Sequence, residues 1–177
     1  MPKLSTLAAA LAFLALAGLG LAAAPTKHEV LRAISIIEKN VSGPEAAEAA
    51  KTIVIYAQVS DDVMVDIGPE QLPWLDEDWG LDKEHEQSCK SLLLAAFVAG
   101  DVRSQIKNDK AEDDTYSGWI FAIDTYNRLK AKEHFTSESI DSLSKMRASG
   151  TLLQHAREVR AKEEQEEGSG DSKKPMA

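Results

Sequence analysis

The chain has 177 residues, with 20 lysines and arginines against 29 aspartates and glutamates, so its formal net charge at pH 7 is −9. Apolar residues make up 44% and aromatic residues 6%, a balance typical of one globular domain and unlike that of an intrinsically disordered chain. This acidic balance argues against a nucleic-acid partner, which would need a basic surface, and a single cysteine excludes both an internal disulfide and a four-cysteine zinc site.

The first segment has the form of a secretory signal peptide. Lys3 precedes an apolar run rich in leucine and alanine from Leu7 to Leu21, and the small residues Ala22 to Ala24 follow it. We expect residues 1–23 to be removed, which would leave an exported protein, periplasmic or secreted, without a membrane segment. The alternative is an uncleaved anchor, because a run of about 17 to 25 apolar residues can span a bilayer.

Two helices are predicted at the start of the mature chain. The first runs from about Thr26 to Asn40, because apolar residues recur there at helical spacing. Ser42 and Glu45 are three residues apart and fit a capping box that begins the second helix. The apolar stripe of this second helix, from Ala46 to Ala57, is rich in alanine, so we expect a neighbouring helix to pack closely against it.

A long connection is predicted from about residue 60 to residue 82, because aspartate, glycine and proline interrupt the helical spacing, with at most one short extended piece. Leu72, Trp74, Leu75 and Trp79 lie in its acidic, proline-containing part. These four side chains either fold back onto the bundle or remain available to a partner. Exposed apolar clusters rimmed by charge mark interaction sites, so we take the four as candidate partner-binding residues.

The third and fourth helices are expected to form the centre of the domain. The third covers about residues 83–108 and contains a run from Leu92 to Gly100 that is apolar on every side, so we expect it to be the most buried helix. The fourth extends from Tyr116 to about Lys132. Its aromatic residues at helical spacing are interpreted as core.

A fifth helix should begin after a cap at Thr136 or Ser137 and either bend or break at Ser149–Gly150. Residues 163–177 are charged or small and are expected to form a disordered tail. The prediction is therefore an all-α domain at residues 24–162: a bundle or two stacked hairpins of about five helices, with one long loop between the second and third.

Motifs for catalysis are scarce. The nearest is His85-Glu86-x-x-Cys89, which has the spacing of a zinc-binding His-Glu-x-x-His helix with cysteine in place of the second histidine. His85 and Cys89 would share a helix face, with Glu86 as a base, but a metal-bound thiolate is vulnerable in an oxidising compartment. The acidic stretch at 76–84 lacks the spacing of an EF-hand calcium loop. We therefore expect an inward-facing Cys89 and no metal or other cofactor.

These features favour a noncatalytic exported helical module that binds another protein, as an inhibitor, an immunity-type protein or an adaptor does. The missing catalytic motifs and the long loop support this hypothesis. Two alternatives stay open: a metal-dependent hydrolase that uses His85, Glu86 and Cys89, and a helical protein that binds a small ligand. Nothing in the sequence indicates the oligomeric state.

The signal-peptide hypothesis makes a direct prediction. Cleavage after Ala23 would place Ala24 at the new N-terminus and keep Pro25 away from the scissile bond. N-terminal sequencing and intact mass of the exported protein should therefore give a chain that begins at Ala24. A full-length chain recovered from a membrane fraction would show that the segment is an anchor.

Overall fold

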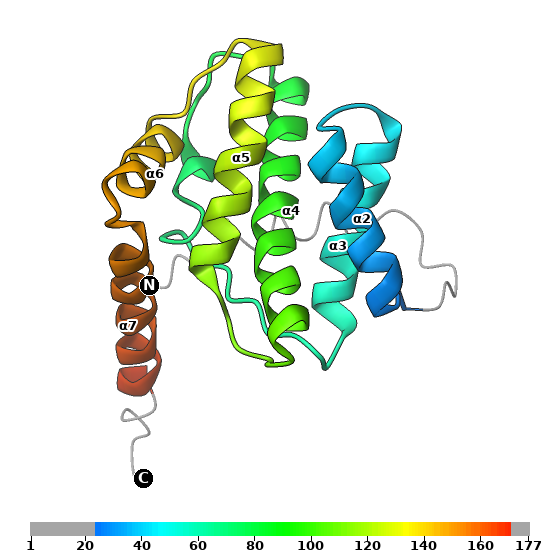
Figure 1. The fold of residues 1–177 in the computed structure, drawn as a ribbon. Coiled ribbons are helices and arrows are strands. Elements are labelled where there is room, and N and C mark those ends of the chain that lie inside the picture. Colours follow the sequence, from blue (N-terminus) through cyan, green and yellow to red (C-terminus); the bar gives the residue numbers. More distant parts are fainter. Residues whose placement is uncertain (1–23, 171–177) are drawn as a thin grey trace, which may run out of the picture.

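The computed structural model describes residues 24–170, and these form an all-helical domain (Figure 1). Its elements are α2 (Lys27–Lys39), α3 (Pro44–Val59), the short 3-10 helix η1 (Pro73–Asp76), α4 (Lys83–Asn108), α5 (Thr115–Glu133), α6 (Glu138–Ser149) and α7 (Leu152–Gly170). No strand occurs in this part of the chain, which confirms the all-α prediction. The predicted signal peptide at 1–23 lies outside the described residues.

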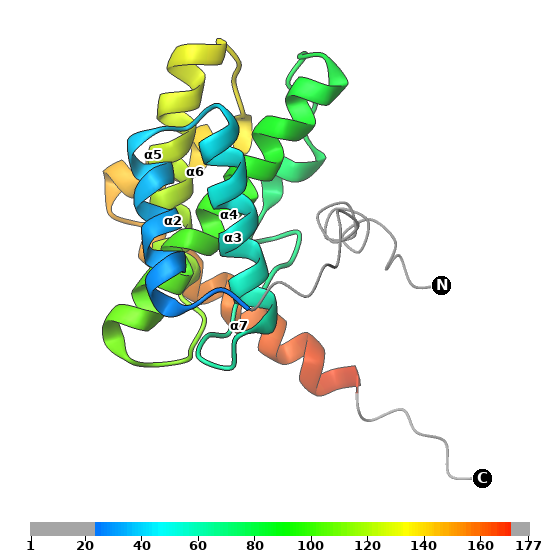
Figure 2. The same ribbon diagram turned by 90° about the vertical axis from the view of Figure 1, so that its right-hand side faces the viewer.

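Helix α4 is the centre of the domain (Figures 1 and 2). The antiparallel pair α2 and α3 packs on one side of it, α5 runs antiparallel to it, and α6 and α7 lie beyond α5. The apolar run predicted to be buried is buried, with Leu93, Phe97 and Ala99 fully enclosed. The long connection carries the chain back past the bundle, so α3 and α4 begin at the same end and run in the same direction.

The helix starts follow local capping chemistry, with one exception to the prediction. Thr26 and Glu29 form a complete capping box at α2. The capping box predicted at Ser42 and Glu45 is wrong, because α3 begins at a Gly43 cap without any side-chain cap bond. The Ser42 backbone N–H and hydroxyl both donate to Asn40 Oδ1, at 3.1 and 3.3 Å, so Ser42 stabilises the turn between α2 and α3 instead.

The predicted fifth helix breaks at Gly150, which gives six α-helices in the described part of the chain where about five were expected. Gly150 ends α6 in the left-handed conformation (φ 79°), which glycine adopts without steric cost. Helix α7 then continues to Gly170, past residue 162, so the backbone of 163–170 is helical where we expected a disordered tail. The stretch is rich in glutamate and glutamine, both good helix formers. Residues 171–177 lie outside the described residues.

Helices α4 and α5 approach closely because each has a glycine at the contact. A Cβ atom added to Gly100 would lie 2.2 Å from the backbone oxygen of Ser117, and one added to Gly118 would lie 2.7 Å from the ring of Phe97. Both distances are below normal van der Waals contact. The position of α5 on α4 therefore depends on the absence of these two side chains.

Gly100→Ala should accordingly destabilise the protein even though alanine is favoured over glycine in a helix by about 1 kcal/mol. The new methyl group would meet backbone, which cannot rotate away, so we expect a lower free energy of unfolding by about 1–3 kcal/mol. Urea denaturation measures the change. Ser88→Ala, at an exposed site of the same helix, is the control and should leave stability unchanged or slightly higher.

Candidate functional site

The long connection does not present its tryptophans to solvent. Leu72, Trp74 and Trp79 are 1%, 0% and 8% exposed, and Leu75 is half-buried. Trp74 meets Phe97 edge-on, and Trp79 stacks on Phe135 with 4.6 Å between ring centroids. The four candidate partner-binding residues therefore do not form an exposed surface: they fold back onto the bundle. The reason is that large rings gain more by covering the apolar flank of α4 than by staying in water.

Polar contacts fix Trp79 in this position. Its indole Nε1 donates to Glu77 Oε2 at 3.0 Å, and its backbone N–H donates to Glu86 Oε2 at 3.0 Å. Glu86 is also 2.7 Å from Lys90 Nζ, which lies over the Trp79 ring. Glu86, the residue considered as a catalytic base, thus holds the connection against the start of α4.

The geometry around Cys89 does not support a metal site. His85 Nε2 lies 3.3 Å from Glu133 Oε2, while Cys89 is buried. Among the residues that the structure describes, no three histidine, cysteine, aspartate or glutamate side chains are arranged to hold a metal ion, the acidic stretch at 76–84 included. Burial, and next the charges of Glu133 and two further carboxylates, raises the pKa of the Cys89 thiol to about 11. A thiol held protonated is a poor ligand and a poor nucleophile.

His85 and Cys89 do share a helix face, as the spacing predicted, but that face lines an apolar groove. The groove has a volume of about 900 Å³ and lies between the first halves of α3 and α4, closed at one end by the last turn of α5. Figure 2 shows the first turns of α4 standing apart from α3 at the end where both helices begin. We call this feature the α3–α4 groove. Its apolar lining consists of Val41, Ala46, Ala47, Ala50, Val54, Cys89, Leu92, Ala95 and Leu129.

The small side chains of α3 explain why space remains between the two helices. Alanines at 46, 47 and 50 line the groove, and their single methyl groups fill little of the space between the helices. The sequence led us to expect that this alanine stripe brings a neighbouring helix close. Helices α3 and α4 are in contact, but in the described part of the chain no helix fills the groove between their first halves.

Polar groups surround the mouth of the α3–α4 groove. Ser42 and Gly43 lie at one edge, Ser88 and His85 at another, and Glu133 beside His85. Asp82 caps α4 through a 3.0 Å bond from the His85 backbone N–H. The arrangement is a preformed apolar surface with a few orienting polar groups, the usual construction of a binding site.

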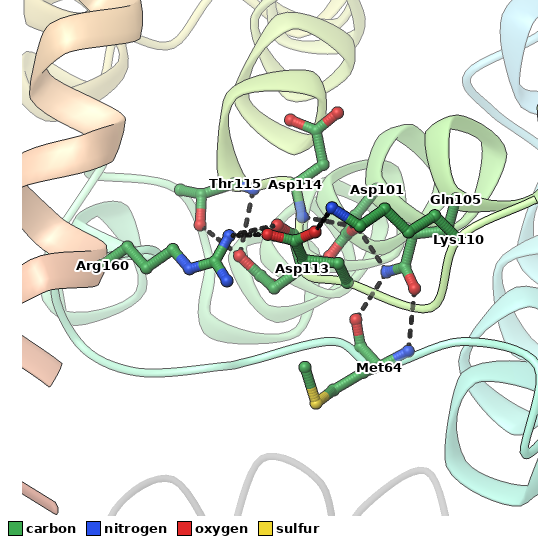
Figure 3. Close-up of polar contacts among 9 residues, drawn as sticks. Met64, Asp101, Gln105, Lys110, Asp113, Asp114, Thr115 and Arg160 are labelled. Carbon is green, nitrogen blue, oxygen red and sulfur yellow. Dashed lines mark hydrogen bonds and ion pairs between the residues drawn. The ribbon is translucent and has the colours of Figure 1, made fainter. Parts of the chain in front are cut away.

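A second feature was missed by the sequence analysis: a carboxyl cluster formed by the buried side chains of Asp101 and Asp113, with the backbone N–H of Asp114 beside them (Figure 3). Asp101 is completely buried in α4, and its Oδ1 accepts from Gln105 Nε2 at 2.7 Å and from the Asp114 N–H at 2.9 Å. The buried apolar run was predicted to end at Gly100, one residue before Asp101. The sequence does contain a sign of this buried polar cluster. Asp101 directly follows the apolar run, and Gln105 lies one helical turn further on the same helix face.

The cluster joins segments that are distant in the sequence. Gln105 Nε2 donates to the Met64 carbonyl at 2.5 Å, and its Oε1 accepts from the Met64 N–H at 2.9 Å. Asp113 Oδ1 accepts from the Asp66 N–H at 3.0 Å, and Asp113 Oδ2 accepts from the Thr115 hydroxyl at 2.7 Å. Most of the carboxylate oxygens thus receive backbone or hydroxyl hydrogen bonds, which indicates a structural role and not acid/base catalysis.

Comparisons of the chain with protein-family models, with curated proteins and with solved structures give no match. In the part of the chain that the structure describes, every helix is too short or too polar to cross a bilayer. The α3–α4 groove and the carboxyl cluster are therefore the features from which a function can be argued.

The raised pKa of Cys89 predicts slow alkylation of its thiol. A shift from 9.0 to about 11 lowers the thiolate fraction at pH 8 about 100-fold, and burial limits access further. Iodoacetamide labelling, followed by mass spectrometry, should be at least about 100-fold slower in the folded protein than in urea at the same pH. Similar rates in the two states would mean that the thiol is ionised and accessible, and would revive the metal and nucleophile alternatives.

Proposed function

We propose that this is an exported, noncatalytic binding protein whose α3–α4 groove receives the apolar face of a helix from another protein. The observation that carries the proposal is the open apolar groove of about 900 Å³ between two helices. The signal-peptide pattern at residues 1–23 supports export. The binding surface proposed here replaces the tryptophan-containing connection, whose side chains are buried.

The dimensions of the groove suit a helix of two to three turns. The lining extends on α3 from Ala46 to Val54, and on α4 from His85 to Ala95. At a rise of 1.5 Å per residue these stretches are about 12 and 15 Å long. A helix laid in such a groove presents anchors at positions i, i+3, i+4 and i+7, which occupy about this length.

The lining also suits close approach of another helix. Helix axes in contact lie about 8–10 Å apart, and the shorter distances require small residues at the interface. Ala47 and Ser88 are small, exposed and placed on opposite walls. A partner could insert larger side chains, such as leucine or phenylalanine, between them and reach Leu92 and Leu129 on the floor. Because the groove is preformed, binding requires little ordering of this chain.

The absence of a catalytic arrangement in the described residues supports a binding role. His85 is beside Glu133, Glu86 holds Trp79, and the thiol of Cys89 is protonated and buried. The buried carboxylates mostly receive backbone and hydroxyl hydrogen bonds. None of these groups stands beside another in the geometry of a nucleophile and its base.

A small apolar ligand is the second candidate occupant. The groove volume lies within the range of about 300–1,000 Å³ typical of small-molecule sites, and its polar groups are few. The small-ligand and helix hypotheses predict that different molecules are recovered with the protein. A lipophilic molecule would co-purify and be found by mass spectrometry of an organic extract, whereas a helix would be found as a cross-linked peptide.

The helix proposal predicts that filling the groove abolishes binding without unfolding the protein. A photoreactive residue at Ser88 should cross-link a partner in the native compartment, and sequencing of the adduct should give an amphipathic helical segment. A synthetic peptide of that segment should then bind the wild-type protein, and Ala47→Trp should weaken its binding at least about 10-fold, because the indole would occupy the anchor position.

Ala148→Trp is the matched control, since Ala148 is exposed on α6 and does not line the groove. It should bind the peptide as the wild type does, and both tryptophan variants should keep the wild-type melting temperature. Equal binding by the Ala47→Trp and wild-type proteins would rule out the groove as the site of helix binding.

A further inference from the structure

The carboxyl cluster contains one oxygen that the hydrogen-bond network leaves unexplained. Asp101 is completely buried, its Oδ1 accepts two hydrogen bonds, and its Oδ2 is buried with no hydrogen-bond donor from residues 24–170 within reach. An ionised carboxylate oxygen that is buried without a hydrogen-bond donor strongly destabilises the folded state. The neighbouring carboxylate of Asp113 accepts hydrogen bonds but has none to donate (Figure 3).

We propose that Asp101 is protonated in the folded protein and shares its proton with Asp113, and that this proton locks the connection between α3 and η1 onto the bundle. A proton on Asp101 Oδ2 turns that oxygen into a donor toward Asp113. The unexplained oxygen is then satisfied, and the pair carries one negative charge in place of two. Paired carboxyl groups in other buried sites behave in this way, because two like charges in contact cannot both ionise easily.

The charged groups around the pair come from three elements. Asp114, Glu112 and Lys110 lie in the turn between α4 and α5, and Asp66 lies in the connection. Arg160 extends toward the cluster from α7 (Figure 3). Arg160 Nη1 is 2.9 Å from Glu112 Oε1 and 3.4 Å from the Asp113 carbonyl. Lys110 also pairs with Glu112. Both cations are therefore directed toward Glu112, on the solvent side of the cluster, while Asp101 lies on its buried side.

The direction of the titration follows from this environment. Burial, and next the charge of Asp113, raises the pKa of Asp101 from 3.8 to about 8. Between these two values the folded protein holds a proton that the unfolded chain has released, so the stability contributed by this group falls as pH rises through the window. Above about pH 8 the folded pair also becomes fully ionised, and the two charges repel each other across the contact that positions the connection.

Two backbone N–H groups of the connection are bonded to the cluster, and through them the shared proton affects the position of the connection. The Asp66 N–H donates to Asp113, and the Met64 N–H donates to Gln105, which itself donates to Asp101. Loss of the shared proton leaves two adjacent negative charges, and their repulsion displaces the side chains of Asp113 and Asp101, which hold these two hydrogen bonds in place. The first half of the connection is therefore expected to open at alkaline pH, before the helices unfold.

Asp101→Asn provides the test, because asparagine donates permanently through its amide and cannot titrate. The ratio of the folding constant of this variant to that of the wild type should rise with pH by up to tenfold per pH unit between about pH 5 and pH 8, and level off above. Urea denaturation at several pH values measures the ratio. Asp61→Asn, at an exposed turn, is the control and should give a ratio independent of pH.

Two measurements on the wild-type protein test the same inference if the variant does not fold. The infrared spectrum at pH 7 should contain the C=O band of a protonated carboxyl group. Amide exchange at Met64 and Asp66, corrected for its intrinsic pH dependence, should accelerate above about pH 8 more than exchange in α4. A parallel pH dependence of the Asp101→Asn and wild-type proteins, or a spectrum without a protonated carboxyl band, would overturn the proposal.

Discussion

Burial of the middle of α4 is the constraint on which the rest of the structure depends. From Leu92 to Val102 this helix is enclosed on all sides, so each neighbouring element is required to cover part of it. Helix α5 covers one side at the short distance that Gly100 and Gly118 allow, and the α2–α3 pair covers another. The connection that contains Trp74 closes a further side through the contact with Phe97. A helix that is apolar all round leaves no side free for solvent.

The need to cover the apolar surface of α4 explains why the tryptophans of the long connection are part of the core. The three helices that contact α4, namely α2, α3 and α5, do not cover all of this 26-residue helix, and α2 is only half its length. Trp74 and Trp79 each bury a large ring at little conformational cost, and the hydrogen bonds that Trp79 donates to Glu77 and Glu86 hold it in place. The loop is long because it has to return along the bundle and supply this cover.

The apolar surface of the bundle is left uncovered at one place, between the first turns of α3 and α4. There the alanines of α3 leave the α3–α4 groove open, with Leu92 and Leu129 on its floor. An apolar surface of this kind, kept open by small residues and surrounded by polar groups, is the feature of the molecule best suited to receive a partner. At the opposite end of α4, Asp101 interrupts the apolar core, and its hydrogen bonds join the connection to the turn before α5.

The sequence by itself determined the all-α class, the bounds of α4, a cap at Thr136 or Ser137 before α6 and a bend or break at Ser149–Gly150, because periodicity, caps and glycine act within one or two helical turns. It also placed His85 and Cys89 on one face. Only the tertiary structure decided whether Trp74 and Trp79 are core or surface, whether the alanines of α3 face a neighbour or a groove, and whether Asp101 meets Asp113. These outcomes depend on contacts between residues far apart in the chain or on separate elements, and local spacing carries no information about which elements meet.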